Sequence, residues 1–293
     1  MVITNNLDLP KAIVKAVDVE PHNKSDKELS ATTLLKGVKE IILTRRHWEK
    51  LTDDAASRIW AIFGQAVHAL LETEGENEFT ECAIKAQLEN DISITGRVDN
   101  YNMETGTIID YKTASIWKVQ FKDFEDWKKQ GLVYAWLLQN NGFKVERCKF
   151  IAILKDHSKS KANYDSQYPQ SPVYIYEFPV TVKDLDDISK FIQGKIDNYL
   201  KYLDVQDDSI PPCTNEERWA TETTYAVMKT GNKKAIRVLK TRLEADNMTA
   251  EKGAGHYVEV RPGTSKKCAE YCICCDHCNF YNNFVKNQSG EQA

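Results

Sequence analysis

The strongest structural signal in the sequence is a hairpin over residues 96–113, GRVDNYNMETGTIIDYKT. Strand-like apolar residues stand on both sides of the turn-like run 103–106. If the turn is centred on that run, residues whose numbers sum to 209 lie opposite each other, which places Asp99 opposite Asp110. The sequence therefore predicts two antiparallel strands with a carboxylate on each.

The charges on this hairpin favour a metal ion. Directly opposed residues have Cβ atoms roughly 4.5 to 5.5 Å apart, and like charges at that separation repel each other. Lys112 shares a strand face with Asp110, because side chains alternate along a strand. Mg²⁺ and Mn²⁺ prefer oxygen ligands and are typically held by one or two carboxylates beside a phosphate. We therefore expect metal-dependent phosphodiester hydrolysis here; the alternative is a solvated turn with a surface Asp-Lys pair.

The composition is that of an ordinary folded protein. Of 293 residues, 42% are apolar and 28% are charged, and the net charge is -4, which does not fit a disordered chain. The longest apolar stretches, such as 131–138, are far shorter than the roughly 20 residues that a bilayer helix needs. The first twenty residues lack the basic and apolar blocks of a secretory signal. We expect a cytoplasmic protein with no membrane partner.

Helical and strand-like patterns are interleaved, which predicts an α/β fold. Residues 1–28 are polar, and we expect them to form an N-terminal arm. The α/β core covers 29–205, and 206–293 contain a basic helical segment, Lys229 to Arg242, and a cysteine-rich region. Helical spacing occurs in 28–47, 54–73, 121–139 and 184–203, and strand-like runs in 92–98, 107–111, 148–156 and 172–180.

Four motifs in these elements resemble those of the PD-(D/E)XK nuclease superfamily. Within it, the sequence is most similar to the RecB-like branch, which includes CRISPR-associated adaptation nucleases with a four-cysteine iron-sulfur cluster. The motifs follow the order of the family: GQAVHALLE at 64–72, GRVD at 96–99, IIDYKT at 108–113 and QGLVY at 130–134. The resemblance implies a restriction-endonuclease-like mixed sheet flanked by helices, in a bacterial or phage-infected cell.

The resemblance also implies roles for individual residues. The catalytic set would be Asp99, Asp110, Lys112, Gln130 and Tyr134. The metal ligands would be His68, Asp99, Asp110 and the backbone carbonyl of Tyr111. From the residues alone, His68 could also be a packed helix residue, and Gln130 with Tyr134 a polar helix edge. Mg²⁺ or Mn²⁺ is the expected cofactor.

Five cysteines fall within eleven residues near the C-terminus: Cys268, Cys272, Cys274, Cys275 and Cys278. Thiols at that density normally bind a metal or a cluster. We expect a structural staple whose four ligands are Cys213, Cys268, Cys272 and Cys278. The resemblance favours a 4Fe-4S cluster. Zinc is the alternative, with Cys274, Cys275 or His277 as substitute ligands, and no cysteine precedes the nuclease motifs as one commonly does in the relatives.

The expected function is a metal-dependent DNA nuclease, an exonuclease on DNA ends or single strands, acting in recombination, repair or CRISPR adaptation with protein partners from those pathways. The alternative is a non-catalytic nucleic-acid-binding or recombination accessory protein with a zinc site. Basic residues in 155–161 and 229–242 could contact phosphates, or could be merely solvated. Trp117, Trp127 and Trp136 could stack on bases, although core packing accounts for most of them. The oligomeric state is left open.

Overall fold

The computed structural model describes residues 1–18, 25–71 and 78–286. The chain divides into two compact units. The first unit comprises Met1–Lys36 and Glu49–Asp204, and the second comprises Gly37–Trp48 and Val205–Ala293. The predicted core, 29–205, therefore differs from the first unit at one internal segment, because 37–48 belong to the second unit. Among the described residues, no helix has the length and apolar character needed to cross a membrane.

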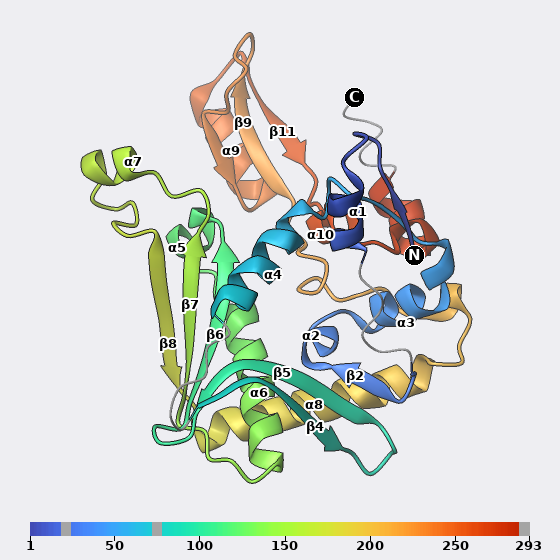
Figure 1. The fold of residues 1–293 in the computed structure, drawn as a ribbon. Helices are drawn as coiled ribbons and strands as arrows, with labels where there is room; N and C mark the ends of the chain where they lie inside the picture. The colour runs from blue at the N-terminus through green and yellow to red at the C-terminus, as the bar shows by residue number, and fades with distance from the viewer. Residues whose placement is uncertain (19–24, 72–77, 287–293) are drawn as a thin grey trace. The chain divides into compact units, whose positions relative to one another are not determined.

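A six-stranded mixed sheet forms the centre of the first unit (Figure 1). Its order is β2-β5-β6-β7-β8, and β4 pairs with β5. The pairs β2–β5 and β6–β7 are parallel, and the other three are antiparallel. The strands are β2 (Glu28–Ser30), β4 (Glu78–Gln87), β5 (Ser93–Asn102), β6 (Thr107–Ala114), β7 (Arg147–Leu154) and β8 (Val173–Pro179). Two short strands, β1 (Val2–Thr4) and β3 (Thr52–Asp54), form a separate parallel pair.

Strand β5 is the point at which the sheet forks. Strand β4 pairs along one edge of β5 over residues 93–102. On the other edge, β2 pairs with 93–95 and β6 with 100–102, so Gly96–Asp99 have no strand partner there among the described residues. The β5–β6 pairs, such as Asn100 with Ile109, have the numbering sum of 209 that the turn predicts. The predicted hairpin register is therefore confirmed for residues 100–102, but the ladder ends there, so Asp99 and Asp110 do not form the predicted cross-strand pair and Asp99 lies at the fork.

Helices flank this sheet. Helix α6 packs on β4, β5, β6 and β7 and against α8. Its close approach depends on Gly96, because a Cβ there would lie 2.7 Å from Leu137 Cδ1 and 3.1 Å from Tyr134 Cε1. The helices are α1 (Lys11–Val17), α2 (Ala31–Leu34), α4 (Ile59–Leu71), α5 (Ile116–Gln120), α6 (Glu125–Asn140), α7 (Lys159–Tyr164) and α8 (Val182–Tyr202). A mixed sheet flanked by helices is the α/β architecture that the sequence predicts.

Several predicted elements differ from the observed ones. The segment 28–47 is not one helix, since β2, α2 and α3 (Val38–Arg46) follow one another and Gly37 caps α3 in an extended conformation. The described part of the expected arm contains β1 and α1. Helix α4 forms as predicted, but none of its residues is buried although they are mostly apolar. Trp60, on this helix, is 60% exposed.

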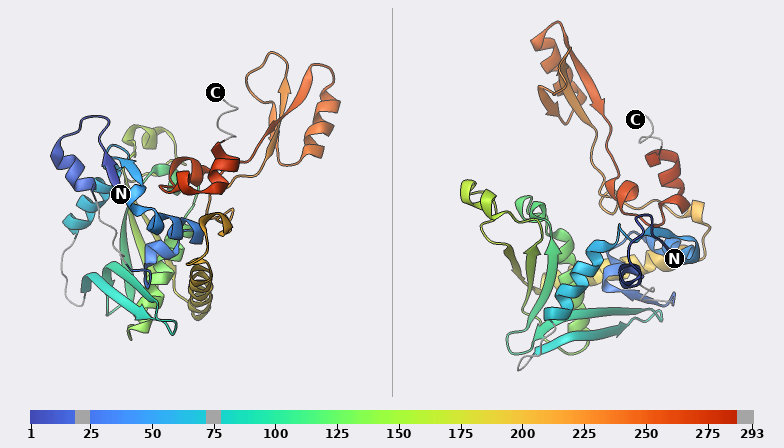
Figure 2. Two further views of the ribbon diagram at one scale, coloured as in Figure 1. Left: turned by 90° about the vertical axis from the view of Figure 1, so that its right-hand side faces the viewer. Right: turned by 45° about the horizontal axis from the view of Figure 1, so that its top comes forward.

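The second unit contains a small antiparallel sheet covered by a helix (Figure 2). The sheet order is β10-β9-β11, and α9 contacts all three strands. These elements are β9 (Thr224–Lys229), β10 (Arg237–Leu239), α9 (Arg242–Lys252) and β11 (His256–Arg261). The predicted basic helix over 229–242 is wrong: Gly231, with φ of 85°, lies between β9 and β10, and the chain turns back there. A left-handed glycine favours a turn, and its basic neighbours lie on a hairpin.

Helix α3 is joined to the C-terminal segment of the second unit by a buried lysine. Lys39 Nζ donates to Asp207 O at 3.0 Å, to Ile210 O at 2.8 Å and to Asn279 Oδ1 at 2.7 Å. The neighbouring Glu40 pairs with Lys267 at 2.6 Å. The remaining short elements are α10 (Lys266–Glu270), the 3-10 turns η1 (Trp48–Lys50), η2 (Asp207–Ser209) and η3 (Cys275–His277), and the π turn η4 (Tyr281–Val285).

Candidate active site

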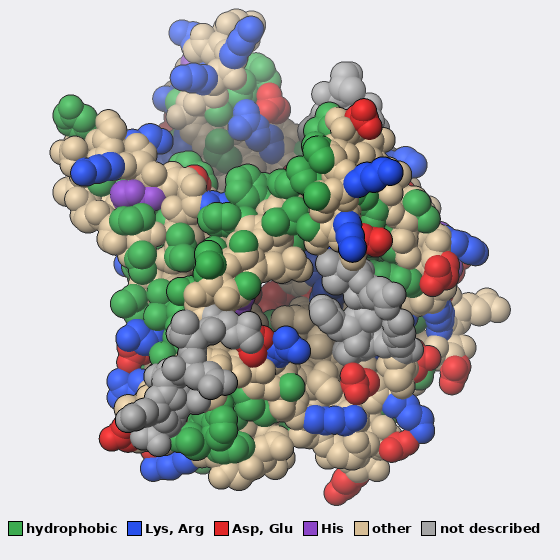
Figure 3. Space-filling view, viewed as in Figure 1, with side chains coloured by type: hydrophobic (Ala, Val, Ile, Leu, Met, Phe, Trp, Pro, Cys, Tyr) green, Lys and Arg blue, Asp and Glu red, His purple; other side chains and the backbone are tan. Residues whose placement is uncertain are grey.

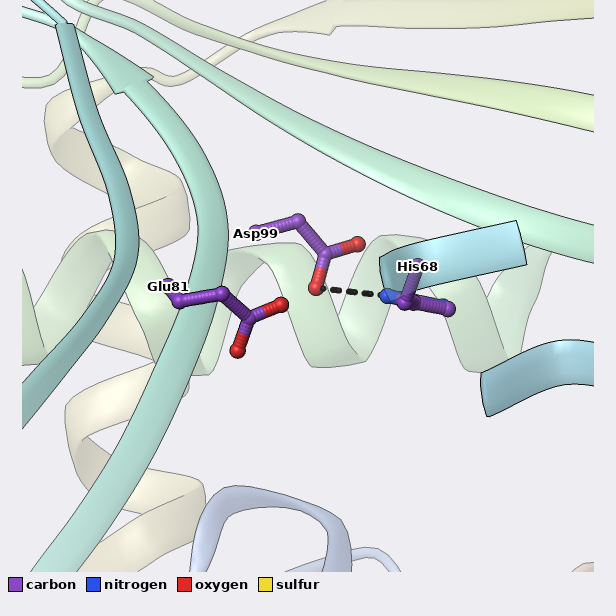
Figure 4. Close-up of side chains that lie close together, drawn as sticks. All are labelled: His68, Glu81 and Asp99. Carbon is purple, nitrogen blue, oxygen red and sulfur yellow. Dashed lines mark ion pairs between the residues drawn. The ribbon is translucent and has the colours of Figure 1, made fainter. Parts of the chain in front are cut away.

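Three potential metal ligands converge at the fork in the first unit (Figure 4). They are His68 from α4, Glu81 from β4 and Asp99 from β5, and one ligand atom of each lies within 4.8 Å of the others. His68 Nδ1 is 3.2 Å from Asp99 Oδ1, and this contact raises the pKa of His68 above its usual value. One imidazole nitrogen and two carboxylates suit a divalent cation that accepts oxygen and nitrogen ligands.

The strand β6 fixes Asp99 and contributes a buried ion pair. The backbone N–H of Tyr111 donates to Asp99 Oδ2 at 2.8 Å, which orients the carboxylate. Asp110 is 2% exposed, and its Oδ2 lies 2.7 Å from Lys112 Nζ. Burial raises the pKa of Asp110 to about 6; Lys112 opposes this rise and the charge of Asp99 adds to it. The structure thus brings together the predicted histidine, both aspartates and the lysine.

Sequence reasoning missed Glu81. Strand β4 pairs with β5 at Thr80 and again at Cys82, but the ladder is interrupted where Glu81 faces Asp99. Glu81 has a φ of 46°, a conformation uncommon outside glycine and often found at functional sites. A signal was present, because Cys82, Ile84 and Ala86 alternate as a strand would. That strand would have placed a second acid opposite Asp99.

Gln130 and Tyr134 lie one helical turn apart on α6, the helix that packs on the strands of the site. Gln130 Nε2 donates to the Tyr134 hydroxyl at 3.0 Å, and the tyrosine ring packs against Gly96 of β5. Burial raises the pKa of Tyr134, and the charge of Asp110 raises it further, so the phenol is protonated at neutral pH. Glu72, the last residue of the GQAVHALLE motif, lies outside the described residues.

A hollow lined by cysteines lies in the second unit. All four predicted ligands, Cys213, Cys268, Cys272 and Cys278, are on its wall, and so are Cys274 and Cys275. The Sγ atoms of Cys272 and Cys274 are 3.6 Å apart. Gly37 leaves room for the Cys213 side chain, because a Cβ at residue 37 would collide with the Cys213 sulfur. The predicted set is therefore gathered in one hollow, with two further thiols available.

A mixed sheet whose fork carries a histidine, three acids and a lysine offers a site that could hold a divalent metal ion. The family model of the PD-(D/E)XK nuclease superfamily matches residues 12–281, and the chain belongs to that superfamily. This membership makes the protein a nuclease with DNA as its substrate, of a family that uses divalent metals.

Several solved structures match parts of the chain at low sequence identity. They include SSO0001, at 18% identity and a TM-score of 0.44 over 64% of this chain and 82% of that one. A phage-related exonuclease from Haemophilus somnus 129PT has 17% identity and a TM-score of 0.36 over 66% and 88%. LHK-Exo in complex with dAMP has 12% identity and a TM-score of 0.38 over 61% and 91%. No curated protein is significantly similar in sequence.

Proposed function

We propose that the protein is a Mg²⁺- or Mn²⁺-dependent deoxyribonuclease that acts as an exonuclease on DNA ends or single strands. The observation that carries the proposal is the grouping of His68, Glu81 and Asp99 beside the buried Asp110–Lys112 pair. The RecB-like motifs, which occur in order from Gly64 to Tyr134, support the exonuclease assignment.

Four side chains would hold the cation: His68, Glu81, Asp99 and Asp110, together with the Tyr111 carbonyl. A bound divalent ion would lower the pKa of a coordinated water and would offset the negative charge that develops on the phosphoryl oxygens. The residues themselves define the rest of the chemistry. Asp110 orients the Lys112 ammonium at 2.7 Å, where it can donate to the attacking water or to a phosphate oxygen. The Tyr111 N–H prevents Asp99 from rotating away.

The Gln130–Tyr134 pair positions the substrate in this proposal. The amide of Gln130 holds the Tyr134 hydroxyl, and the raised pKa of that hydroxyl keeps it a hydrogen-bond donor. A neutral donor near two carboxylates can approach a DNA phosphate without adding negative charge. We therefore assign Tyr134 to substrate positioning and Gln130 to fixing its orientation.

We also propose that Cys213, Cys268, Cys272 and Cys278 hold a 4Fe-4S cluster, with zinc as the alternative. Their convergence on one hollow supports a four-thiolate site, and the space left by Gly37 supports Cys213 as the fourth ligand. Such a group would connect Cys213 to the C-terminal segment as a structural staple. Anaerobic purification, an absorption spectrum and metal analysis decide between iron and zinc.

The test of the nuclease proposal is degradation of end-labelled single-stranded and duplex DNA with Mg²⁺ or Mn²⁺. The Lys112→Ala variant should lose roughly 10² to 10³ in rate, because one charge-stabilising donor is removed. The matched control is Lys144→Ala, since Lys144 is an exposed lysine paired with Glu146. Equal activity of Lys112→Ala and the wild type would contradict the mechanism.

A further inference from the structure

Large aromatic side chains are exposed at one edge of the first unit. Trp60 at the start of α4 is 60% exposed; Trp117 of α5 and Phe121, which directly follows α5, are 58% and 73% exposed. The rings of Trp117 and Phe121 are stacked, with centroids 5.7 Å apart and planes 17° from parallel. Exposed aromatic surface of this extent is typical of an interaction site. Trp117 is thus not a core residue, whereas Trp127 is 6% exposed and buried.

Backbone and side-chain contacts place these rings along the same edge of the sheet. Lys155, which follows β7, donates its N–H to Ala114 O at the end of β6, and its Nζ lies 3.9 Å from the centroid of the Trp60 ring. The next residue, Asp156, accepts from Ser115 Oγ at 2.6 Å and from the N–H of Ile116 at 2.7 Å, so it anchors α5. Figure 3 shows hydrophobic side chains along this edge, between the ends of β6 and β7 and the start of α4. We name Trp60, Trp117, Phe121 and Lys155 the aromatic edge.

The aromatic edge is connected to the metal centre by a single helix. Trp60, Gly64 and His68 are spaced four residues apart on α4 and share one helix face. A Cβ at Gly64 would lie 3.7 Å from Thr113 Oγ1, so this face runs against β6. The eight residue steps from Trp60 to His68 span about 12 Å along the helix axis. That distance corresponds to at most about three or four nucleotides at the 3.4 Å per-strand rise of duplex DNA, and to fewer in an extended single strand.

The charge beside the aromatic edge suits phosphates. Residues 155–161 contain three exposed lysines, Lys155, Lys159 and Lys161, and none of them is in an ion pair with another described residue. The only acid in this run, Asp156, is occupied by its hydrogen bonds to α5. Aromatic platforms combined with cations are the means by which proteins bind single-stranded nucleic acid without reading its sequence.

We propose that the aromatic edge stacks on the unpaired bases of a DNA single strand whose scissile phosphate lies a few nucleotides away at the metal centre. The faces of bases inside a duplex are already stacked on each other, so this edge selects single-stranded DNA. The inference rests on the proposed nuclease function and names the substrate form. It also gives the exposed ring of Trp60 a role.

The first test is binding of a fluorescently labelled ten-nucleotide single strand in EDTA, which stops hydrolysis. Because stacking contributes about 1–3 kcal/mol per base, Trp60→Ala and Phe121→Ala should each weaken binding roughly 5- to 150-fold. Trp60→Phe should keep most of the affinity, since it retains an aromatic face. The matched control is Trp219→Ala, because Trp219 is 51% exposed in the second unit. Wild-type affinity for both Trp60→Ala and Phe121→Ala would overturn the proposal.

The second test compares hydrolysis of a dinucleotide with that of the ten-nucleotide strand. A dinucleotide at the metal centre is too short to reach Trp60, so the increase in KM caused by Trp60→Ala should be much larger for the longer strand. An equal effect on both lengths would also overturn the proposal, since Trp60 would then act on the metal centre itself. If the wild type binds single strands through Trp60 but hydrolyses no DNA with either metal, the nuclease function fails and the binding inference stands.

Discussion

The carboxylate centre and the cysteine hollow are built in opposite ways. The first collects His68, Glu81, Asp99 and Asp110 from a short part of the chain, and these acids repel one another when no cation is bound. In the second, the buried Lys39 of α3 forms hydrogen bonds to residues that lie more than 160 positions further along the chain. We therefore expect activity to depend on the first region and stability on the second, so that substitutions should separate the two properties.

The largest expected effect is on activity. Asp110→Asn should lower kcat by about 10³, because a metal ligand and the orientation of Lys112 are lost together. The free energy of unfolding of the metal-free protein should not fall at pH 7.5, since the amide removes a buried charge from an acidic site. Urea unfolding in EDTA, read beside kcat, measures both. A parallel loss of stability would make Asp110 a structural residue instead.

The second region should show the reverse behaviour. Lys39→Met leaves the carbonyls of Asp207 and Ile210 and the amide of Asn279 without their donor. We expect a loss of about 3 kcal/mol in the free energy of unfolding, because unsatisfied buried acceptors are costly. At a temperature at which the variant is folded, kcat for DNA hydrolysis should stay within about twofold of the wild type. A variant as stable as the wild type would show that Lys39 does not join α3 to the C-terminal segment.

A smaller loss of stability is expected at the staple itself. Cys272→Ser should reduce bound iron or zinc and lower the free energy of unfolding by about 2 kcal/mol, since a ligand that binds only the folded state stabilises it. Cys82→Ser is the control, because Cys82 lies in β4, outside the hollow. Metal analysis and thermal melting are the measurements. Unchanged metal content together with full thermal stability would exclude the staple.

A further effect, of similar size, concerns the dependence of stability on pH. The pKa of Asp110 is raised from 3.8 to about 6 and that of His68 is raised above 6.5, so the folded protein binds these protons more tightly than the unfolded chain. The stability they contribute is complete below pH 4 and is lost as pH rises through 6 and above 6.5. We expect a decline of about 1–3 kcal/mol in EDTA between pH 4 and pH 7.5.

The control for this pH dependence is Asp110→Asn, which should decline less over the same range. Metal binding should show the opposite slope, because Mg²⁺ and Mn²⁺ bind the deprotonated groups. Activity should therefore rise as pH increases through 6. A wild-type stability that does not change with pH in EDTA would mean that Asp110 is not strained by burial.

The sequence predicts those parts of the molecule that depend on local pattern. The register of β5 and β6 follows from the position of one turn, and helix α6 follows from its apolar spacing. Glu81 was not predicted as a site residue, because the conformation that directs it toward Asp99 also interrupts the regular ladder of β4. The basic run 229–242 has helical spacing, but the turn at Gly231 decides its structure.

Long-range features were beyond the reach of local pattern. Helix α3 has ordinary helical spacing, and nothing in that spacing shows that it belongs with the C-terminal segment. The exposure of Trp60 could not be predicted for a related reason. An apolar stripe on a helix normally predicts burial against the core, whereas the Trp60 side chain is exposed. The most informative departures from the predicted fold thus lie at the candidate metal centre, at the aromatic edge and in α3.

The assignment of residues 37–48 to the second unit restricts how the protein can be dissected. A chain cut after Asp204 would keep α3 and lose Asp207, Ile210 and Asn279, the residues that accept its buried ammonium group. Such a fragment would carry a helix without its partners inside an otherwise complete catalytic domain. A minimal version should instead excise 37–48 as well and join Lys36 to Glu49 through a short flexible linker.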